Sequence, residues 1–402
     1  MAEKTNVPEI RFAGFTDPWE QRKFSDLTDR VSIQSNDPNL PQVEYEDIIS
    51  GEGALNKDLN DKEGGKTGIK FYVGDVLYGK LRPYLMNWLY PQFNGVAVGD
   101  FWVLRATECD SSFLYRLVQT DGFQRLANVS SGSKMPRADW NLISQSFFAV
   151  PANHAEQKAI AKSLAELDSL ITLHQRKYDK LAQLKKSMLD KMFPKPGERF
   201  PEIRFAGFTD PWEQRKLGEL FAESDERSST EEILSVSVAN GIYPASESDR
   251  DTNPGASISN YKIVRVGDIV YNSMRMWQGA VGSSKYNGIV SPAYVVAKPV
   301  VELDSTCFGY LLKRPEMLYK YLCDSQGNSK DTQTLRYERF AEITAEVPST
   351  IEEQRAISNC LEGLDNLITL HQREPPHTMK EGKNVNRYQW RIAFLRLLLA
   401  MD

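Results

Sequence analysis

The sequence lacks several features that would assign it to other protein classes. No apolar run approaches the ~20 residues needed to cross a bilayer, and the opening MAEKTNVPEI contains no signal-peptide core. The 4 cysteines have no Cys-x-x-Cys spacing, which favours reduced structural thiols over metal ligands or disulfides. The Asn-Pro-Pro-aromatic and Asp-Pro-Pro-aromatic tetrapeptides typical of amino-methyltransferases are absent, and we find no other catalytic constellation. These absences predict a cytoplasmic protein with no membrane partner, no metal site and no catalytic residues.

The chain also has little net charge. It contains 402 residues, with 49 Lys and Arg against 54 Asp and Glu, which gives a formal net charge of -5. A mildly acidic chain does not coat nucleic acid by bulk attraction, although a local basic patch is compatible with this balance. The length is sufficient for two domains that each bury their own core.

One segment of the chain occurs twice. Residues Pro8 to Lys23, PEIRFAGFTDPWEQRK, recur without change from Pro201 to Lys216. A period of about half the chain is too long for a solenoid, whose repeats span ~20 to 50 residues. The sequence therefore predicts two duplicated domains. Most of the sequence that follows each copy has diverged, as expected of two domains that share a scaffold and recognise different targets.

Each copy continues through the same series of anchors. A Gly-Asp step leads into two apolar residues and a tyrosine, and an arginine follows four residues later. Each half then closes with a proline, a Glu-Gln pair and an apolar helical pattern. The matched anchors are Gly74 to Tyr78 with Gly267 to Tyr271, Arg82 with Arg275, Pro151 with Pro348, Glu156 with Glu353, Gln157 with Gln354, and 171–176 with 368–373.

Apolar residues recur in alternating steps of four and three after each Glu-Gln pair, a spacing typical of a coiled-coil seam. In the first half, Pro151 and a capping Asn153 mark the start of the helix, and Pro194 marks its end. This helix would reach ~60 Å at 1.5 Å per residue, so we interpret it as a spacer. The two similar stripes are expected to pack on each other. The predicted seam comprises Ile160, Leu164, Leu167, Ile171, His174, Tyr178, Leu181, Ile357, Leu361, Leu364, Ile368 and His371.

Two windows that follow the Gly-Asp steps, 76–99 and 269–301, contain no Asp or Glu. A third acid-free window, 122–138, surrounds a Ser-Gly turn and has a polar counterpart near 327–336. Arg and Lys reach phosphates or guanine edges, and Asn and Gln pair with adenine. An ordinary solvated surface explains any single residue, and a core position is favoured for the tryptophan, but the matched windows favour DNA contact. The candidates are Lys80, Arg82, Tyr84, Lys134, Arg137, Asn272, Arg275, Trp277, Gln278, Lys330 and Arg336.

Together these features resemble the specificity subunit of type I restriction-modification systems. The resemblance covers residues 8–373 and includes the Lys-Met-Phe-Pro run at Lys191 to Pro194. It implies an α+β fold with two globular α+β target-recognition domains, joined by long antiparallel coiled-coil spacer helices in a pseudo-two-fold internal repeat. It also implies a non-enzymatic subunit whose domains each read one half of a bipartite, asymmetric site in double-stranded DNA. The implied partners are two methyltransferase subunits, which would bring S-adenosylmethionine, and restriction (motor-nuclease) subunits. The chain itself would bind no cofactor.

The expected organisation is a repeat segment at 1–23, a target-recognition domain at 24–151, a spacer helix at 152–193, a linker repeat at 194–216, a second target-recognition domain at 217–348, a truncated spacer helix at 349–374 and an atypical tail at 375–402. The tail departs from the resemblance because Pro375 and Pro376 stop the second helix. A substitute docking helix, a membrane-surface element and frameshifted sequence without a selected role all remain open for its basic, amphipathic end.

Two rival functions are compatible with the sequence. A stand-alone DNA nuclease or methyltransferase with a divergent site would cut or methylate DNA alone, although the missing motifs argue against it. A protein adaptor would show no salt-dependent DNA binding in its assembled complex.

Overall fold

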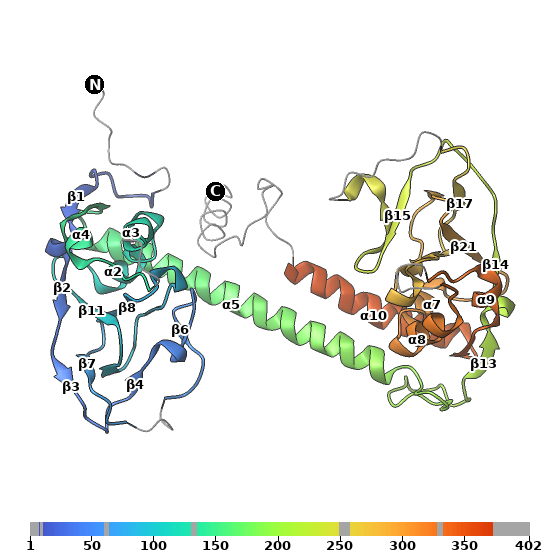
Figure 1. Cartoon of the computed structure of the whole chain (residues 1–402), viewed down its shortest axis with the longest axis horizontal. Helices are drawn as coiled ribbons and strands as arrows, with labels where there is room; N and C mark the ends of the chain where they lie inside the picture. Colours follow the sequence, from blue (N-terminus) through green and yellow to red (C-terminus); the bar gives the residue numbers. More distant parts are fainter. Residues whose placement is uncertain are drawn as a thin grey trace. The chain divides into compact units, whose positions relative to one another are not determined.

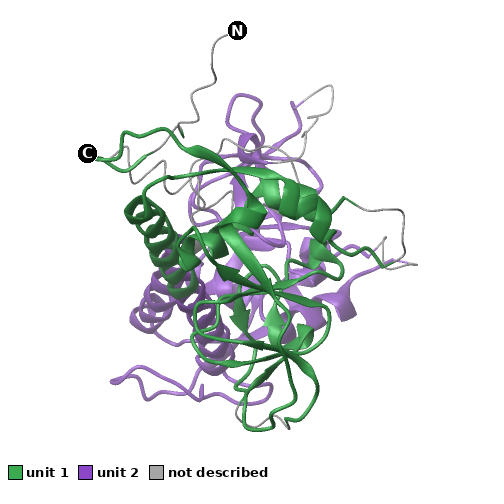
Figure 2. Ribbon diagram, turned by 90° about the vertical axis from the view of Figure 1, so that its left-hand side faces the viewer, with its two compact units in different colours: residues 1–173, 374–402 green, residues 174–373 purple. Residues whose placement is uncertain are grey.

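The computed structural model describes residues 8, 11–59, 64–129, 135–248, 258–327 and 333–372. The chain divides into two compact units, residues 1–173 with 374–402 and residues 174–373, which Figure 2 distinguishes by colour. Each unit combines small sheets with short helices. The long helix α5 (His154–Lys191) contributes its first part to the first unit and the remainder to the second (Figure 1). The predicted α+β fold class is confirmed.

The strands of the first unit are β1 (Glu20–Lys23), β2 (Thr28–Val31), β3 (Gln34–Ser35), β4 (Gln42–Val43), β5 (Ile48–Ile49), β6 (Ala54–Leu55), β7 (Gly68–Phe71), β8 (Val76–Gly79), β9 (Trp88–Leu89), β10 (Gly95–Ala97), β11 (Phe101–Ala106) and β12 (Phe147–Val150). Its helices are α1 (Phe24–Leu27), α2 (Ser111–Leu117), α3 (Asp121–Ala127) and α4 (Trp140–Gln145), with 3-10 turns η1 (Tyr45–Asp47) and η2 (Pro83–Leu85).

The strands of the second unit are β13 (Glu213–Lys216), β14 (Phe221–Glu223), β15 (Leu234–Ser237), β16 (Gly241–Pro244), β17 (Lys262–Val264), β18 (Ile269–Asn272), β19 (Val281–Ser283), β20 (Gly288–Val290), β21 (Tyr294–Pro299) and β22 (Thr344–Val347). Its helices are α6 (Leu217–Leu220), α7 (Ser305–Leu311), α8 (Pro315–Asp324), α9 (Tyr337–Glu342) and α10 (Ile351–Gln372), with 3-10 turns η3 (Ala245–Glu247) and η4 (Met276–Gln278).

The duplicated sequence folds into duplicated sheets. A four-stranded antiparallel sheet in the order β2-β11-β8-β9 in the first unit corresponds to the order β14-β21-β18-β19 in the second. A two-stranded ribbon, β1-β12 or β13-β22, brings the end of each repeated segment beside the strand that precedes each long helix. The mixed sheet β3-β7-β10-β4 of the first unit has only two-stranded ribbons, β15-β16 and β17-β20, in its place in the second.

The Gly-Asp step forms a tight turn that leads into an inner strand of each four-stranded sheet, β8 in the first unit and β18 in the second. Gly74 and Gly267 have φ angles of 92° and 93°, in the left-handed region that glycine adopts without a Cβ penalty. The Asp75 carboxylate accepts a hydrogen bond from the Tyr72 amide at 2.8 Å, and Asp268 does the same for Arg265. The shared motif is therefore a structural turn.

Aromatic residues are the largest fully buried side chains in the core of each unit. In the first unit Phe24 and Tyr78 lie beneath Phe123, with ring centroids 5.2 Å apart in both pairs. In the second unit Tyr271 lies against Phe340 at 5.1 Å. Each side chain of this size removes a large apolar area, about 150–250 Å², from water.

The Glu-Gln pair at the start of each long helix holds two other segments in place. Glu156 accepts both guanidinium hydrogen bonds of Arg11, at 2.7 and 2.8 Å, and a third bond from Trp19. The neighbouring Gln157 bonds the Asp110 amide and the Pro151 carbonyl. The second half repeats these contacts with Glu353 joined to Arg204 and Trp212, and with Gln354 joined to Asp304 and Pro348.

The two units differ in how they cover this anchor. In the second unit the segment after α5 supplies Phe193, whose ring stands edge-on to Trp212 at 5.8 Å, and Trp212 is fully buried. Trp19 of the first unit remains half-buried. The end of the first long helix thus completes the core of the second unit.

The long helices are antiparallel where both belong to the second unit. The His174 and His371 rings meet with their Nδ1 atoms 3.0 Å apart. Lys185, which follows His174 on α5, forms an ion pair with Asp365, which precedes His371 on α10. The N-terminal cap predicted at Asn153 is confirmed, because its side chain accepts a hydrogen bond from the Ala155 amide at 2.8 Å.

The predicted seam is only partly a helix-to-helix contact. Ile357 and Leu361 belong to the core of the second unit, and Ile160 packs on the core of the first. The expectation that the whole stripe faces the other helix is therefore wrong at these positions, because each helix first covers its own domain. His174 is exposed, and His371 is half-buried. Leu167 and Leu364 are buried, and Leu164, Ile171, Tyr178, Leu181 and Ile368 are half-buried.

Two sequence-based expectations concern membrane-spanning helices and the state of the cysteines. Within the described residues, no helix is long and apolar enough to span a membrane. All four cysteines are free thiols, and burial raises the pKa of Cys109 to about 12. The tail at 375–402 and the end predicted for the second spacer helix lie outside the described residues.

Candidate nucleic-acid interface

In the first unit two sequence-distant windows come together at the end of β8. The Arg82 amide donates a hydrogen bond to the Pro136 carbonyl at 2.7 Å, and the Ala138 amide donates to the Lys80 carbonyl at 2.8 Å. Residue Arg82 has a φ of 50°, a left-handed conformation that is uncommon for a side chain with a Cβ. Its guanidinium is exposed, as is the Tyr84 ring in the following turn η2. The fold thus places Lys80, Arg82 and Arg137 on one patch.

The acid-free windows do not make this patch free of acids. Asp100, one residue beyond the first window, lies 3.0 Å from Arg137 and 3.4 Å from Lys80. Partial burial alone would raise the pKa of Asp100, but the hydrogen bonds and charges of Arg137 and Lys80 outweigh it and lower the pKa. Two of the predicted cations are therefore already paired in the free protein. Arg82 is the predicted cation here with neither an ion pair nor a side-chain hydrogen bond within the described residues.

The second unit builds the corresponding patch at the end of β18. The Asn272 side chain accepts a hydrogen bond from the Met274 amide at 3.0 Å, which fixes the turn that leads to Arg275. The Leu335 amide donates to the Ser273 carbonyl at 2.9 Å, so the segment that ends in Arg336 lies beside this turn. The side chains of Arg275, Gln278 and Arg336 are exposed.

Trp277 occupies an intermediate position. Its ring packs against the core of the second unit, as the sequence favoured, while η4 carries its exposed neighbours. The indole N–H is buried and has no hydrogen-bond partner within the described part of the chain. A buried donor without a partner is costly, so the η4 turn is held by packing rather than by this group.

Two predicted residues, Lys134 and Lys330, lie outside the described residues. Asp100 and Tyr45 are two residues of this patch that the sequence did not predict. The Tyr45 hydroxyl donates a hydrogen bond to the Asp100 carbonyl at 2.5 Å and accepts one from the Leu81 amide at 3.1 Å. The position of Asp100 directly after an acid-free window was a usable signal. Tyr45 carries no comparable signal, because the contact joins residues 36 positions apart.

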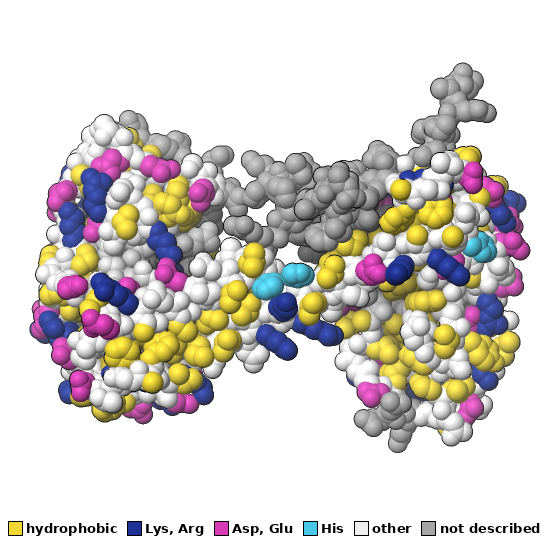
Figure 3. Space-filling view, turned by 180° about the vertical axis from the view of Figure 1, so that it is seen from behind, with side chains coloured by type: hydrophobic (Ala, Val, Ile, Leu, Met, Phe, Trp, Pro, Cys, Tyr) yellow, Lys and Arg dark blue, Asp and Glu magenta, His cyan; other side chains and the backbone are white. Residues whose placement is uncertain are grey.

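Charge on the visible surface is mixed. Figure 3 shows Lys and Arg side chains interspersed with Asp and Glu on each unit, and two adjacent histidines, without one continuous basic face. This distribution agrees with the net charge of -5, and on this face it restricts any electrostatic footprint to local patches. No cluster of three or more potential metal ligands occurs among the residues that the structure describes.

Comparison with known proteins gives two sequence matches. Residues 209–377 match the family described as type I restriction modification DNA specificity domain. The type I restriction enzyme EcoDI specificity subunit of Escherichia coli is 24% identical over 204 residues, which cover 48% of this chain and 46% of that protein. The chain therefore spans about half the length of the curated relative that it matches.

Two crystal structures are similar over almost the whole chain. The S subunit of a type I restriction-modification system from M. genitalium has a TM-score of 0.54 at 12% identity, with 98% of this chain and 97% of that chain covered. The HsdS subunit from Thermoanaerobacter tengcongensis has a TM-score of 0.44 at 16% identity, with 98% of both chains covered. The first likeness extends over both repeats and supports a common fold. Residues 209–377 carry the match to the type I restriction modification DNA specificity domain, and the similarity in fold to the type I restriction-modification S subunit extends over both repeats.

Proposed function

We propose that this chain is the DNA-recognition subunit of a type I restriction-modification complex and reads a bipartite, asymmetric double-stranded site with its two domains. One observation carries the proposal. In each half, the segment after β8 or β18 is joined by a backbone hydrogen bond to a distant segment, from Arg82 to Pro136 and from Leu335 to Ser273. Exposed arginines flank both junctions: Arg82 and Arg137, and Arg275 and Arg336. Arginine is the side chain that most often reads guanine in the major groove.

The two patches share a frame but differ in their side chains. The first offers Arg82 and Tyr84 beside the Asp100 cluster, and the second offers Arg275 and Gln278 beside Trp277. Inequivalent patches on a repeated frame favour two different half-sites, and hence an asymmetric target. The spacer helices would set the gap between the half-sites.

Exposed leucines on the long helices support docking of two copies of one partner. Leu170 and Leu173 are 44% and 48% exposed on α5, and Leu367 and Leu370, at the corresponding positions of α10, are 46% and 61% exposed. Repeated apolar positions on a pseudo-symmetric frame can present equivalent surfaces to two identical subunits. We assign this role to two methyltransferase subunits, which would bring S-adenosylmethionine, while restriction subunits would join the assembled complex. In this proposal the chain has no catalytic role of its own.

The test is DNA binding by the chain assembled with its methyltransferase partner. Fluorescence anisotropy at several salt concentrations should give preferential binding to one target duplex, with affinity that falls linearly on a log-log salt plot. The chain alone should neither cleave nor methylate DNA. Salt-independent or absent DNA binding by the assembled complex would favour the adaptor alternative, and activity of the isolated chain would favour the catalytic one.

A further inference from the structure

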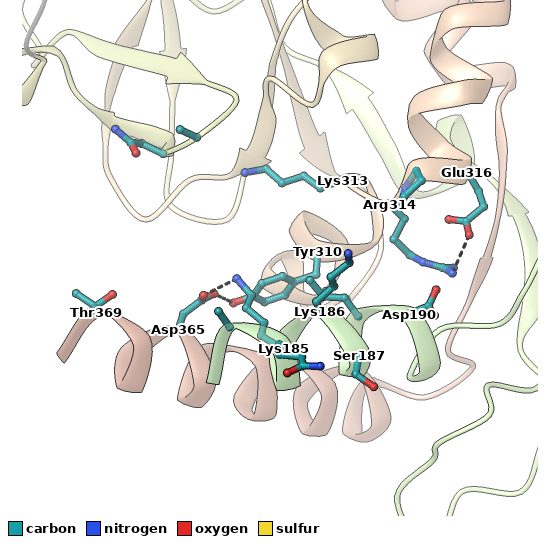
Figure 4. Close-up of a pocket in the computed structure, with 16 residues that line it drawn as sticks. Lys185, Lys186, Ser187, Asp190, Tyr310, Lys313, Arg314, Glu316, Asp365 and Thr369 are labelled. Carbon is teal, nitrogen blue, oxygen red and sulfur yellow. Dashed lines mark hydrogen bonds and ion pairs between the residues drawn. The ribbon is translucent and has the colours of Figure 1, made fainter. Parts of the chain in front are cut away.

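A cavity of about 1110 Å³ lies within the second unit, where the end of α5 and α10 face the junction between α7 and α8 (Figure 4). Helix α5 contributes Lys185 and Lys186, and the α7–α8 junction contributes Lys313 and Arg314. The turn between β15 and β16 contributes Asn240. Four cationic side chains therefore line this cavity beside three carboxylates, Asp190, Glu316 and Asp365.

Two of the carboxylates already have cationic partners. Asp365 forms the ion pair with Lys185 and accepts a hydrogen bond from the Tyr310 hydroxyl at 2.6 Å. Glu316 lies 3.3 Å from Arg314, which also donates to the Pro194 carbonyl at 2.9 Å. Within the described residues, neither Lys186 nor Lys313 has an ion pair or a side-chain hydrogen bond.

Lys313 is the unusual member of this set. Its side chain is half-buried and extends across the cavity (Figure 4), and its amine lies against Gly241, the residue after Asn240. Burial lowers the pKa of Lys313, and the charge of Lys185 lowers it further, while Asp365 opposes the shift. An ammonium group withdrawn from water without a direct ion-pair partner is unfavourable, and a bound anion would offset this cost.

The cavity adjoins the candidate nucleic-acid interface of the same unit. Gly279, directly after η4, lies against Leu318 and Val238. Leu318 belongs to the first turn of α8, which begins at the cavity, and Val238 precedes Ala239 in its lining. Gly279, at the end of the turn that carries Arg275 and Gln278, thus lies against two residues that are one to two positions in sequence from the cavity lining.

We propose that this cavity binds a phosphate group, held by Lys313 with Lys185 and Lys186. Lysine ammonium groups bind phosphate as point charges. The expected source of this phosphate is the DNA backbone beside the η4 turn, and to this extent the inference rests on the proposed function. Free inorganic phosphate is the other source of the same group. The site is specific to the second half, because Gln119 occupies the position of Lys313 nine residues after the helix-capping aspartate of the first half.

The test compares the full-length chain with Lys313→Gln, which introduces the residue found in the first half. Lys180→Gln, at an exposed position of α5 outside the cavity, is the matched control. In the first arm, inorganic phosphate is titrated against chloride at constant ionic strength. It should raise the melting temperature of the wild type and of Lys180→Gln with the concentration dependence of ligand linkage, and leave Lys313→Gln unchanged.

In the second arm, the affinity of the complex with methyltransferase for target and unrelated duplexes is measured against salt. Lys313→Gln should weaken both duplexes by the same factor and reduce the log-log slope by about 1. A response in both arms assigns the phosphate to DNA, and a response in the phosphate arm alone assigns it to free phosphate. No response of the wild type to phosphate, together with no effect of Lys313→Gln on DNA, overturns the site. Failure of the wild type to bind DNA at all would instead contradict the proposed function, while the phosphate arm would still test the cavity.

Discussion

Replacing Arg204 by methionine should destabilise the second unit strongly, because Arg204 neutralises a carboxylate that has almost no access to water. The Glu353 side chain is 1% exposed and the Arg204 side chain 14% exposed, and their bidentate contact has N–O distances of 2.7 and 2.8 Å. Without the guanidinium, Glu353 retains one bond from the Trp212 indole at 3.2 Å. Methionine preserves much of the length of the arginine stem, so the loss reflects the uncompensated charge rather than a cavity.

Removal of one partner from a buried ion pair costs about 3 to 5 kcal/mol. We expect the lower end, ~3 kcal/mol, because the arginine retains some exposure. For a domain of this size, ~1 kcal/mol shifts the melting temperature by about 2–4 °C, so the transition of the second unit should fall by about 6–12 °C.

The assay is differential scanning calorimetry, which records the unfolding transition of each unit, because the chain contains 7 tryptophans and their fluorescence does not report on Trp212 alone. Glu353→Gln removes the charge and keeps the shape, and the double variant Arg204→Met/Glu353→Gln should lose less stability than the sum of the single variants. The equivalent change Arg11→Met should act on the unfolding of the first unit instead. A loss below ~1 kcal/mol for Arg204→Met, the range of exposed surface pairs, would refute the view that this contact anchors the repeated segment.

Three further predictions follow from the same structure. Alanine at Arg82 or Arg275 should cost ~1 to 3 kcal/mol of specific DNA affinity and relax one base position each, whereas the target motif and affinity of the complex should both be unchanged if neither arginine reads a base. A second change inserts one heptad between Leu167 and Ile171 and a matching heptad between Leu364 and Ile368, which adds ~10 Å of helix. The half-sites should stay the same while the gap between them widens by a few base pairs. An unchanged gap would show that the helices do not set the gap. The hydrogen bond from Arg11 lowers the pKa of Glu156. The stabilising contribution of this ion pair is therefore present above the unfolded pKa of ~4.3 and is lost as pH falls through the folded value. The stability of the wild type should decline more steeply on acidification than that of Glu156→Gln, and parallel pH profiles would contradict this.

The parts of the fold that the sequence predicted carry local signals. The repeated segment is identical in both copies, and the helices combine a capping Asn153 with apolar residues at helical spacing. The Gly-Asp steps recur at turns where the backbone requires a glycine, Gly74 and Gly267, with φ angles near 92°.

The parts that the sequence did not predict depend on contacts between distant residues. Nothing in the helical spacing of Ile357 and Leu361 distinguishes a seam from a domain core, and α7 together with the end of α5 buries them in the core. Asp100 joins Lys80 and Arg137 only after residues 37 positions apart are brought together. The cavity around Lys313 likewise requires α5, α10 and the α7–α8 junction to converge.

The central claim is that two inequivalent domains read the two halves of one DNA site. Methylome sequencing of a host that lacks other modification systems, with and without this gene beside its methyltransferase partner, tests it most directly. The account predicts one new methylated motif that depends on this gene, with two different specific halves separated by a gap of fixed length. A methylome unchanged by the gene, or a continuous or palindromic motif without a gap, would contradict it.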